Sequence, residues 1–60
     1  MGYYATGETI YCEDIYTDSG FDGKSLAAFT KECLQLLDEL GGGHIDIYNE
    51  NDKFIKSVEV

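Results

Sequence analysis

The chain has 60 residues, of which twelve are Asp or Glu, four are Lys and none is Arg, so its formal net charge is -8. Sixty residues make at most one domain, and because a chain of this size buries only about 60% of the surface of its unfolded form, we expect marginal stability. An apolar content of 43% with five Tyr and three Phe excludes a disordered tail, and the scarcity of cations argues against direct binding to nucleic-acid phosphates.

The N-terminal third predicts β-strands. Residues 3–6 and 8–16 are rich in Tyr, Thr and Ile, which favour strands. Gly7 is either a bend between two short strands or a bulge within one. Residues 17–24 contain Asp18-Ser19-Gly20 and Asp22-Gly23, which are typical of a loop.

A helix follows the loop. Ser25 is a good N-cap, with Asp22 or Gly23 as an alternative start. Apolar residues then recur at helical spacing, and the glycine run 41–43 predicts the end of the helix because glycine adopts the left-handed C-cap conformation without steric cost. The apolar stripe comprises Leu26, Phe29, Cys33, Leu36, Leu37 and Leu40.

A hairpin is predicted after the glycines. Residues 44–48 alternate polar and apolar, so Ile45 and Ile47 share one face, and residues 49–52 have turn chemistry. In the returning strand, residues 53–60, the inward face is led either by Phe54 or by Ile55, and a bulge would reconcile the two. The fold class is therefore α+β, with one helix on a small antiparallel sheet of three to four strands in a single domain of residues 1–60.

No catalytic, cofactor or metal motif is complete. The loop at Asp18 and Asp22 lacks the oxygen ligand and the terminal Glu of a calcium loop, which would fall at Gly20 and Phe29. His44 has no partner at the spacing of a catalytic triad or a zinc site. Since so short a chain hardly encloses a cleft that raises a carboxyl pKa, we expect no enzyme activity and no cofactor.

Cysteine usage and hydropathy bear on location. Cys12 and Cys33 have no CxxC spacing, and they are either reduced core residues or a bridged pair. The N-terminus lacks a secretory pattern. No apolar stretch approaches the roughly 20 residues that span a bilayer. We expect a cytoplasmic protein without a membrane partner.

Acids and tyrosines are the candidate binding residues. Asp38 and Glu39 lie in the last helical turn, where the helix dipole disfavours anions, so their acidity is not explained by stability. Alternate side chains along a strand are about 6.6 to 7 Å apart, close to the spacing of successive phosphates. We expect acids at the helix end, at Glu13-Asp14, in the Asp18/Asp22 loop and in the Glu50/Asp52 turn to approximate such an array, and so to occupy a groove built for nucleic acid by DNA or RNA mimicry. Arg in a partner would pair with carboxylates and stack on Tyr rings. The candidate residues are Glu13, Asp14, Asp18, Asp22, Asp38, Glu39, Asp46, Glu50, Asp52, Tyr11 and Tyr48.

In size, charge and tyrosine content the chain resembles small acidic phage-encoded inhibitors, such as anti-CRISPR proteins, anti-restriction proteins and uracil-DNA glycosylase inhibitors. The resemblance implies a basic, nucleic-acid-binding protein partner, no cofactor, a location in the host cytoplasm and often a homodimer. Two alternatives remain: a small structural or assembly protein whose acidity serves only solubility, and an antitoxin-like protein that neutralises a basic toxin.

Overall fold

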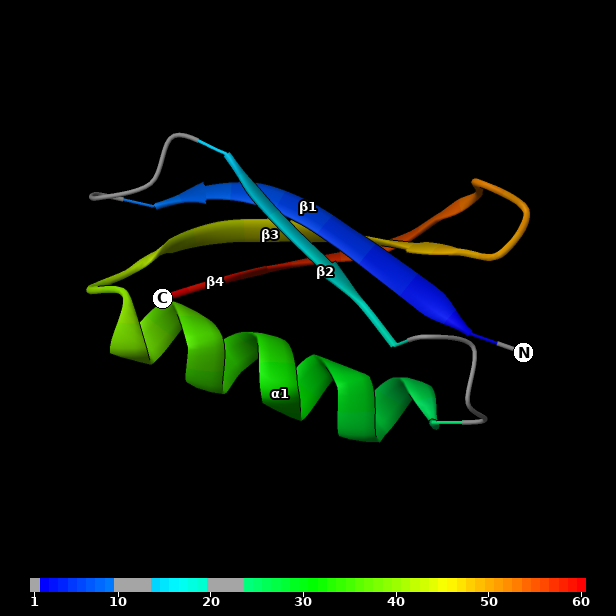
Figure 1. Cartoon of the computed structure of the whole chain (residues 1–60), viewed down its shortest axis with the longest axis horizontal. Helices are drawn as coiled ribbons and strands as arrows, with labels where there is room; N and C mark the ends of the chain where they lie inside the picture. Colours follow the sequence, from blue (N-terminus) through cyan, green and yellow to red (C-terminus); the bar gives the residue numbers. More distant parts are fainter. Residues whose placement is uncertain (1, 10–13, 20–23) are drawn as a thin grey trace.

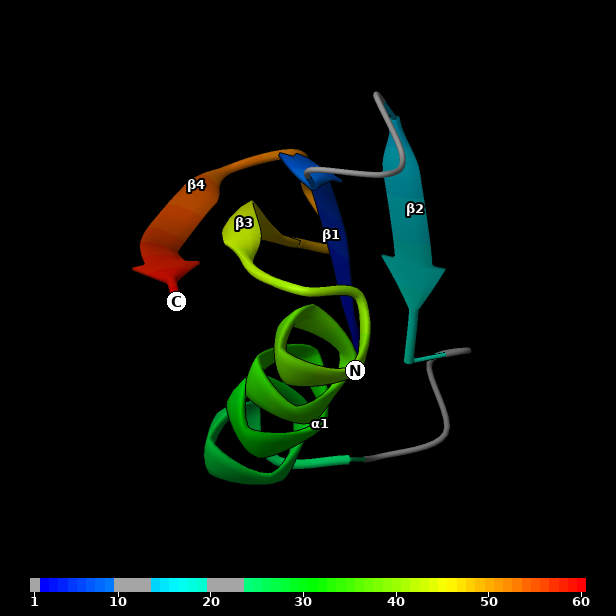
Figure 2. The same ribbon diagram turned by 90° about the vertical axis from the view of Figure 1, so that its left-hand side faces the viewer.

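A helix and a four-stranded antiparallel sheet form two layers in the computed structural model, which describes residues 2–9, 14–19 and 24–60. The elements are β1 (Tyr3–Thr9), β2 (Ile15–Asp18), α1 (Leu26–Glu39), β3 (Gly43–Asn49) and β4 (Phe54–Glu59). The helix crosses one face of the sheet and packs on β1, β3 and β4, whereas no described element covers the other face (Figures 1 and 2). The α+β class predicted from the sequence is confirmed.

The helix begins and ends where its sequence predicts. The Ser25 side chain accepts a hydrogen bond from the backbone N–H of Ala28 at 3.2 Å, as an N-cap does. At the other end Gly42 N–H bonds to the Leu37 carbonyl at 2.8 Å and Gly41 N–H to the Asp38 carbonyl at 3.3 Å. These two bonds form a Schellman motif, which requires the positive φ of 89° at Gly41.

The strands are ordered β2-β1-β3-β4, so the two hairpins β1-β2 and β3-β4 lie side by side through β1 and β3. Gly7 was expected at a bend or bulge, but it lies inside β1, paired with Ile15 and Ile45. A Cβ at this position would overlap the backbone carbonyl of His44, so glycine permits the close approach of β1 and β3. β2 extends to Asp18, which the sequence assigned to a loop, because Ser19 prolongs its pairing to Tyr3 through two 2.9 Å hydrogen bonds.

The register of β4 contains an irregularity between Ile47 and Tyr48, which resolves the ambiguity after Lys53. Val58 pairs with Ile45 and faces the helix, while Phe54 pairs with Tyr48 on the opposite face and is 54% exposed. Ile55 packs against the core instead. The bulge therefore allows both Ile55 and Val58 to contribute to the core, and Phe54 does not lead the inward face.

The core lies between the helix and the central strands. Its buried residues are Ala5, Phe29, Cys33, Leu37, Ile45, Ile47 and Val58. The ring of Tyr3 stacks on Phe29 with centroids 6.2 Å apart. Cys33 is a free thiol at 0% exposure, and burial, together with the charge of Glu32, raises its pKa. Cys12, the other member of the predicted pair, lies outside the described residues.

None of the described residues belongs to a helix with the length and apolar character needed to cross a bilayer.

Candidate binding surface on the open face of the sheet

The face of the sheet opposite α1, which we call the open face, carries three rows of outward side chains that run across the strands. The register places residues of four strands side by side in each row, with Asp14 one position beyond Ile15, the last residue of β2 that pairs with β1 at this end. The acidic row comprises Asp14, Glu8, His44 and Glu59. The polar row comprises Tyr16, Thr6, Asp46 and Ser57. The aromatic row comprises Asp18, Tyr4, Tyr48 and Phe54.

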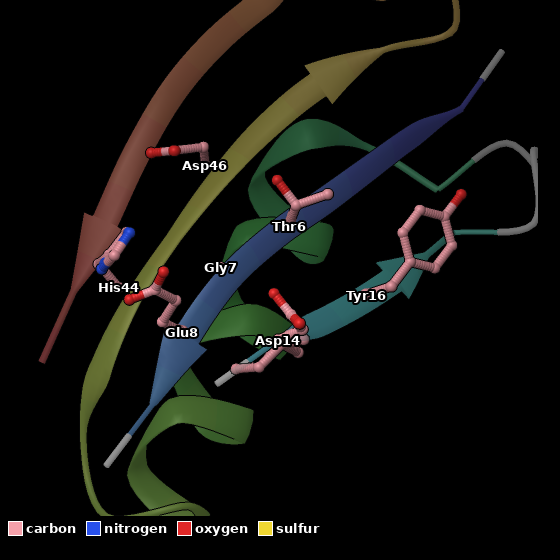
Figure 3. A pocket seen from close by; sticks show the side chains of 8 residues that line it. Thr6, Gly7, Glu8, Asp14, Tyr16, His44 and Asp46 are labelled. Carbon is pink, nitrogen blue, oxygen red and sulfur yellow. The ribbon is translucent and has the colours of Figure 1, made fainter. Parts of the chain in front are cut away.

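The acidic row lies at the end of the sheet where β1 and β4 finish. Glu8 pairs with His44 of β3, and His44 pairs with Glu59 of β4. On the other side of Glu8 is Asp14, and Figure 3 shows both carboxylates on the same side of the sheet. Two carboxylates, those of Glu8 and Glu59, therefore flank the imidazole of His44, Asp14 lies beyond Glu8 in the same row, and Asp46 adds a carboxylate in the next row.

The aromatic row is a ladder of stacked rings. Tyr4 stacks on Tyr48 with ring centroids 5.1 Å apart, and Tyr16 of the polar row stacks on Tyr4 at 6.0 Å. Phe54 meets Tyr48 edge to face at 5.8 Å. Aromatic cross-strand neighbours stabilise a sheet, yet Tyr16 remains 64% exposed. The ladder is therefore both a stabilising feature and an accessible apolar surface.

Two phenols of the ladder hold carboxylates beside the rings. Tyr4 donates a 2.6 Å hydrogen bond to Oδ1 of Asp52, and Tyr16 donates a 3.1 Å bond to Oδ2 of Asp18. The bond to Asp52, followed by desolvation and the charge of Asp52, raises the pKa of Tyr4 to about 12. The bond to Asp18 likewise raises the pKa of Tyr16. Both phenols therefore remain protonated donors at neutral pH, and the two carboxylates are held at the edge of the aromatic rings.

A shallow hollow of about 470 Å³ lies between the acidic and polar rows (Figure 3). Glu8, Asp14, His44 and Asp46 line it together with Tyr16 and Thr6. Asp46 accepts a 2.8 Å hydrogen bond from the Ser57 hydroxyl, which fixes its orientation. The hollow is thus an acidic depression with an aromatic wall, open to a group of opposite charge.

The lysines lie elsewhere. Lys24 precedes the helix and is paired with Glu32 at 2.8 Å, and Lys31 is on the helix itself. Lys56 pairs with the buried Ile47, which places it on the helix side of the sheet. Lys53 lies between the hairpin turn and β4. No lysine therefore occupies an outward strand position on the open face, whereas six acids lie on or beside it: Glu8, Asp14, Asp18, Asp46, Asp52 and Glu59.

The predicted site residues divide into three groups. The structure brings Asp14, Asp18, Asp46, Asp52 and Tyr48 together on the open face. Asp38 and Glu39 are exposed in the last turn of α1, in the other layer, and Glu50 is in the hairpin turn. Glu13, Asp22 and Tyr11 lie outside the described residues.

No described strand carries acids at all of its successive outward positions. Successive outward positions of β2 and its flank read Asp14, Tyr16, Asp18, and those of β1 read Tyr4, Thr6, Glu8. The two acids that are direct neighbours, Asp14 and Glu8, lie opposite each other on adjacent strands, which are about 4.8 Å apart.

Sequence reasoning did not assign the other residues of the three rows to a binding surface, and it considered His44 only for catalysis and metal binding. The acids and aromatic residues among them are Glu8, Glu59, Tyr4, Tyr16 and Phe54. Their shared signal is parity, since residues 4, 6 and 8 alternate with the inward Tyr3 and Ala5. Parity shows that such residues share a face, but the sequence does not show which face the helix covers.

Among the described residues, no group of three His, Cys, Asp or Glu is arranged to hold a metal ion. The hollow places His44 beside carboxylates. In the described part of the chain, His44 makes no hydrogen bond to a Ser or Cys side chain that would act as a nucleophile. What the arrangement offers chemically is recognition of cations by charge and by aromatic faces.

Comparison with known proteins adds no relative. No protein-family model, curated protein or solved structure has a significant match to this chain.

Proposed function

We propose that this protein is a non-enzymatic inhibitor that binds a basic, nucleic-acid-binding protein through the open face and blocks the access of nucleic acid to it. The observation that carries the proposal is the segregation of charge. Six carboxylates lie on or beside one face, and no lysine occupies an outward strand position there. A surface that needs only solubility has both signs interspersed.

The acidic row costs stability, which supports a role in binding. Like charges directly opposite each other on neighbouring strands destabilise a sheet. Asp14 and Glu8 are such a pair, one position beyond Ile15 and Gly7. Since folding gains nothing from this pair, the row is best explained by a positively charged partner.

The aromatic row indicates Arg as the contact residue of that partner. A guanidinium pairs with carboxylates in a planar fork and also stacks on aromatic rings. Tyr16, which stacks on Tyr4 at one end of the ladder, is 64% exposed, while the Tyr4 hydroxyl holds Asp52 beside the stacked rings. The carboxylate of Asp52 uses Oδ1 for this bond and has further acceptor sites for an external donor.

Occlusion then depends on charge and stacking, without a copy of the regular phosphate spacing of DNA. Anti-CRISPR proteins and other inhibitors of nucleic-acid enzymes act on partners of this chemical class, and a CRISPR effector is one example. The partner would be a protein whose basic channel binds nucleic acid in the absence of the inhibitor.

Affinity capture tests the proposal. The immobilised protein is exposed to a bacterial lysate at an ionic strength of 20 mM, which is about one-seventh of the physiological value. Bound proteins are then eluted with a salt gradient. We expect nucleic-acid-binding proteins that elute as salt rises and that duplex or single-stranded DNA displaces.

Two variants of equal charge show which face binds. Glu8→Gln with Asp46→Asn removes two charges from the open face, and Asp38→Asn with Glu39→Gln removes two from the end of the helix. The open-face variant should lose the captured proteins while the helix variant retains them. Equal loss in both variants would show that only net charge matters and would contradict an open-face site.

Self-assembly is the second candidate function, favoured by the exposed apolar side chains. Phe54 and Tyr16 on the open face are 54% and 64% exposed. A homodimer built on this surface would persist in high salt, whereas the complex with a basic partner would dissociate. In 1 M NaCl surface charges are screened beyond about 3 Å. Light scattering at micromolar concentration in this buffer separates the two functions, because only the homodimer would keep its mass.

A further inference from the structure

β4 forms an edge of the sheet, and its backbone has hydrogen-bonding groups directed away from β3. Val60 exchanges both backbone hydrogen bonds with Gly43, at 3.0 and 3.2 Å. Hydrogen-bonded and non-bonded pairs alternate along an antiparallel ladder. Ser57 and Glu59 therefore direct their N–H and C=O groups toward the free edge, where another strand can pair with them.

An apolar groove of about 450 Å³ runs beside this edge, between β4 and α1. The helix lines it with Leu26, Ala27, Thr30 and Leu34, and Leu34 is 38% exposed. A free strand edge next to a groove between strand and helix is the geometry by which β-augmentation domains take up an extended peptide. The backbone provides affinity there, and the groove accepts alternate side chains.

Two lysines give the groove a charge opposite to that of the rest of the molecule. Lys31 of α1 and Lys56 of β4 both line it. Among residues 2–9, 14–19 and 24–60, Lys24 forms an ion pair with Glu32. Lys31 and Lys56 form no ion pair with a carboxylate of these described residues. A lysine on an edge strand deters indiscriminate strand pairing, and here its charge selects an acidic strand.

A second copy of the chain fits this edge less well. Two identical β4 edges that pair about a two-fold axis bring the same patch of each chain together. The helix side of β4 in the second copy carries Lys56 and no carboxylate side chain, because Glu59 pairs with His44 on the open face, so such a pair would gather lysines without a counter-charge. A strand that places carboxylates beside Lys31 and Lys56 supplies this counter-charge.

We propose that β4 and the groove bind an extended acidic peptide segment of another protein as a fifth strand. The segment would pair with the backbone of Ser57 and Glu59, place an apolar side chain against Leu34, and place a carboxylate two residues away beside Lys31 and Lys56. This site is separate from the open face and selects the opposite charge.

NMR titration of the full ¹⁵N-labelled chain tests this site. The probe is a synthetic peptide, Thr-Leu-Thr-Asp-Thr-Leu-Thr-Asp-Thr, in which Leu and Asp share one face of a strand. We expect amide shifts at Ser57, Glu59 and Leu34. A peptide with Lys in place of both Asp, and one that is N-methylated at alternate amides, should each lose binding.

Two matched variants separate the groove from bulk charge. The double variant Lys31→Gln with Lys56→Gln should lower the affinity for the peptide by roughly three- to tenfold, as expected for the loss of two partly exposed ion pairs. Lys53→Gln, outside the groove, should leave affinity unchanged. Shifts confined to the open face, equal binding of the Lys peptide, or self-association through β4 without peptide would each overturn the proposal.

Discussion

Removal of one carboxylate from the acidic row should stabilise the fold. Glu8 and Asp14 lie opposite each other beyond Gly7 and Ile15, and cross-strand β-carbons are about 5 Å apart. At that distance two unit charges in water repel by about 0.8 kcal/mol. Screening reduces the repulsion to about 0.7 kcal/mol in 0.01 M salt and about 0.4 kcal/mol in 0.15 M salt.

Glu8→Gln removes this repulsion and keeps the shape of the side chain. Since 1 kcal/mol shifts the Tm of a domain of this size by about 4–8 °C, we expect Tm to rise by about 3–6 °C in 0.01 M salt and about 2–3 °C in 0.15 M salt. Thermal unfolding followed by circular dichroism measures both values. Glu50→Gln is the control, because Glu50 is in the hairpin turn and lies outside the paired strands. Equal gains for the two variants, or a gain that does not depend on salt, would refute cross-strand repulsion at Glu8.

The other predictions concern the core and the aromatic ladder. Phe29→Ala should lower the free energy of unfolding by roughly 3 kcal/mol or more, because Phe29 is fully buried and stacked on Tyr3; an unaltered melting point would show that Phe29 is not a core residue. Gly7→Ala should destabilise the fold by roughly 1–3 kcal/mol, since its Cβ overlaps the His44 carbonyl, and denaturant unfolding at wild-type stability would contradict this. The phenol of Tyr4 has its pKa raised from 10.0 to about 12, so the bond to Asp52 contributes stability that is complete below pH 10 and is lost as pH rises through 12. Tyrosine ionisation is followed by the absorbance of tyrosinate at about 295 nm as pH is raised. The phase at the highest pH should be absent from the titration curve of Tyr4→Phe, because Tyr4 is the last phenol to ionise. A variant curve that keeps this high-pH phase would exclude the hydrogen bond in solution.

Local chemistry made the helix and the second hairpin predictable. The stripe that contains Phe29 and Cys33, the cap at Ser25 and the glycines after Leu40 each depend on residues within a few positions of one another. The bulge in β4 was one of the alternatives that the sequence left open, and the structure selects it, because Ile55 and Val58 cannot both face the core in a regular strand.

Long-range pairing made the rest unpredictable. The course of β1 through Gly7 depends on its contact with β3, more than 35 positions later along the chain. The candidate site depends on the same pairing, since Glu8, His44 and Glu59 become neighbours only after three strands are in register. Asp38 and Glu39 were grouped with the strand acids because stability does not explain acids in the last helical turn, and the sequence does not show that they lie in the layer away from the open face.

The most direct measurement of the open face is an NMR titration of the ¹⁵N-labelled chain with a peptide of about nine arginines, a length that spans the sheet in extended form. We expect the largest amide shifts at Glu8, His44, Asp46 and Tyr4, and their loss in the variant Glu8→Gln with Asp46→Asn. Shifts that are spread evenly over the molecule, or that are largest at Asp38 and Glu39, would contradict a cation-binding surface on the open face.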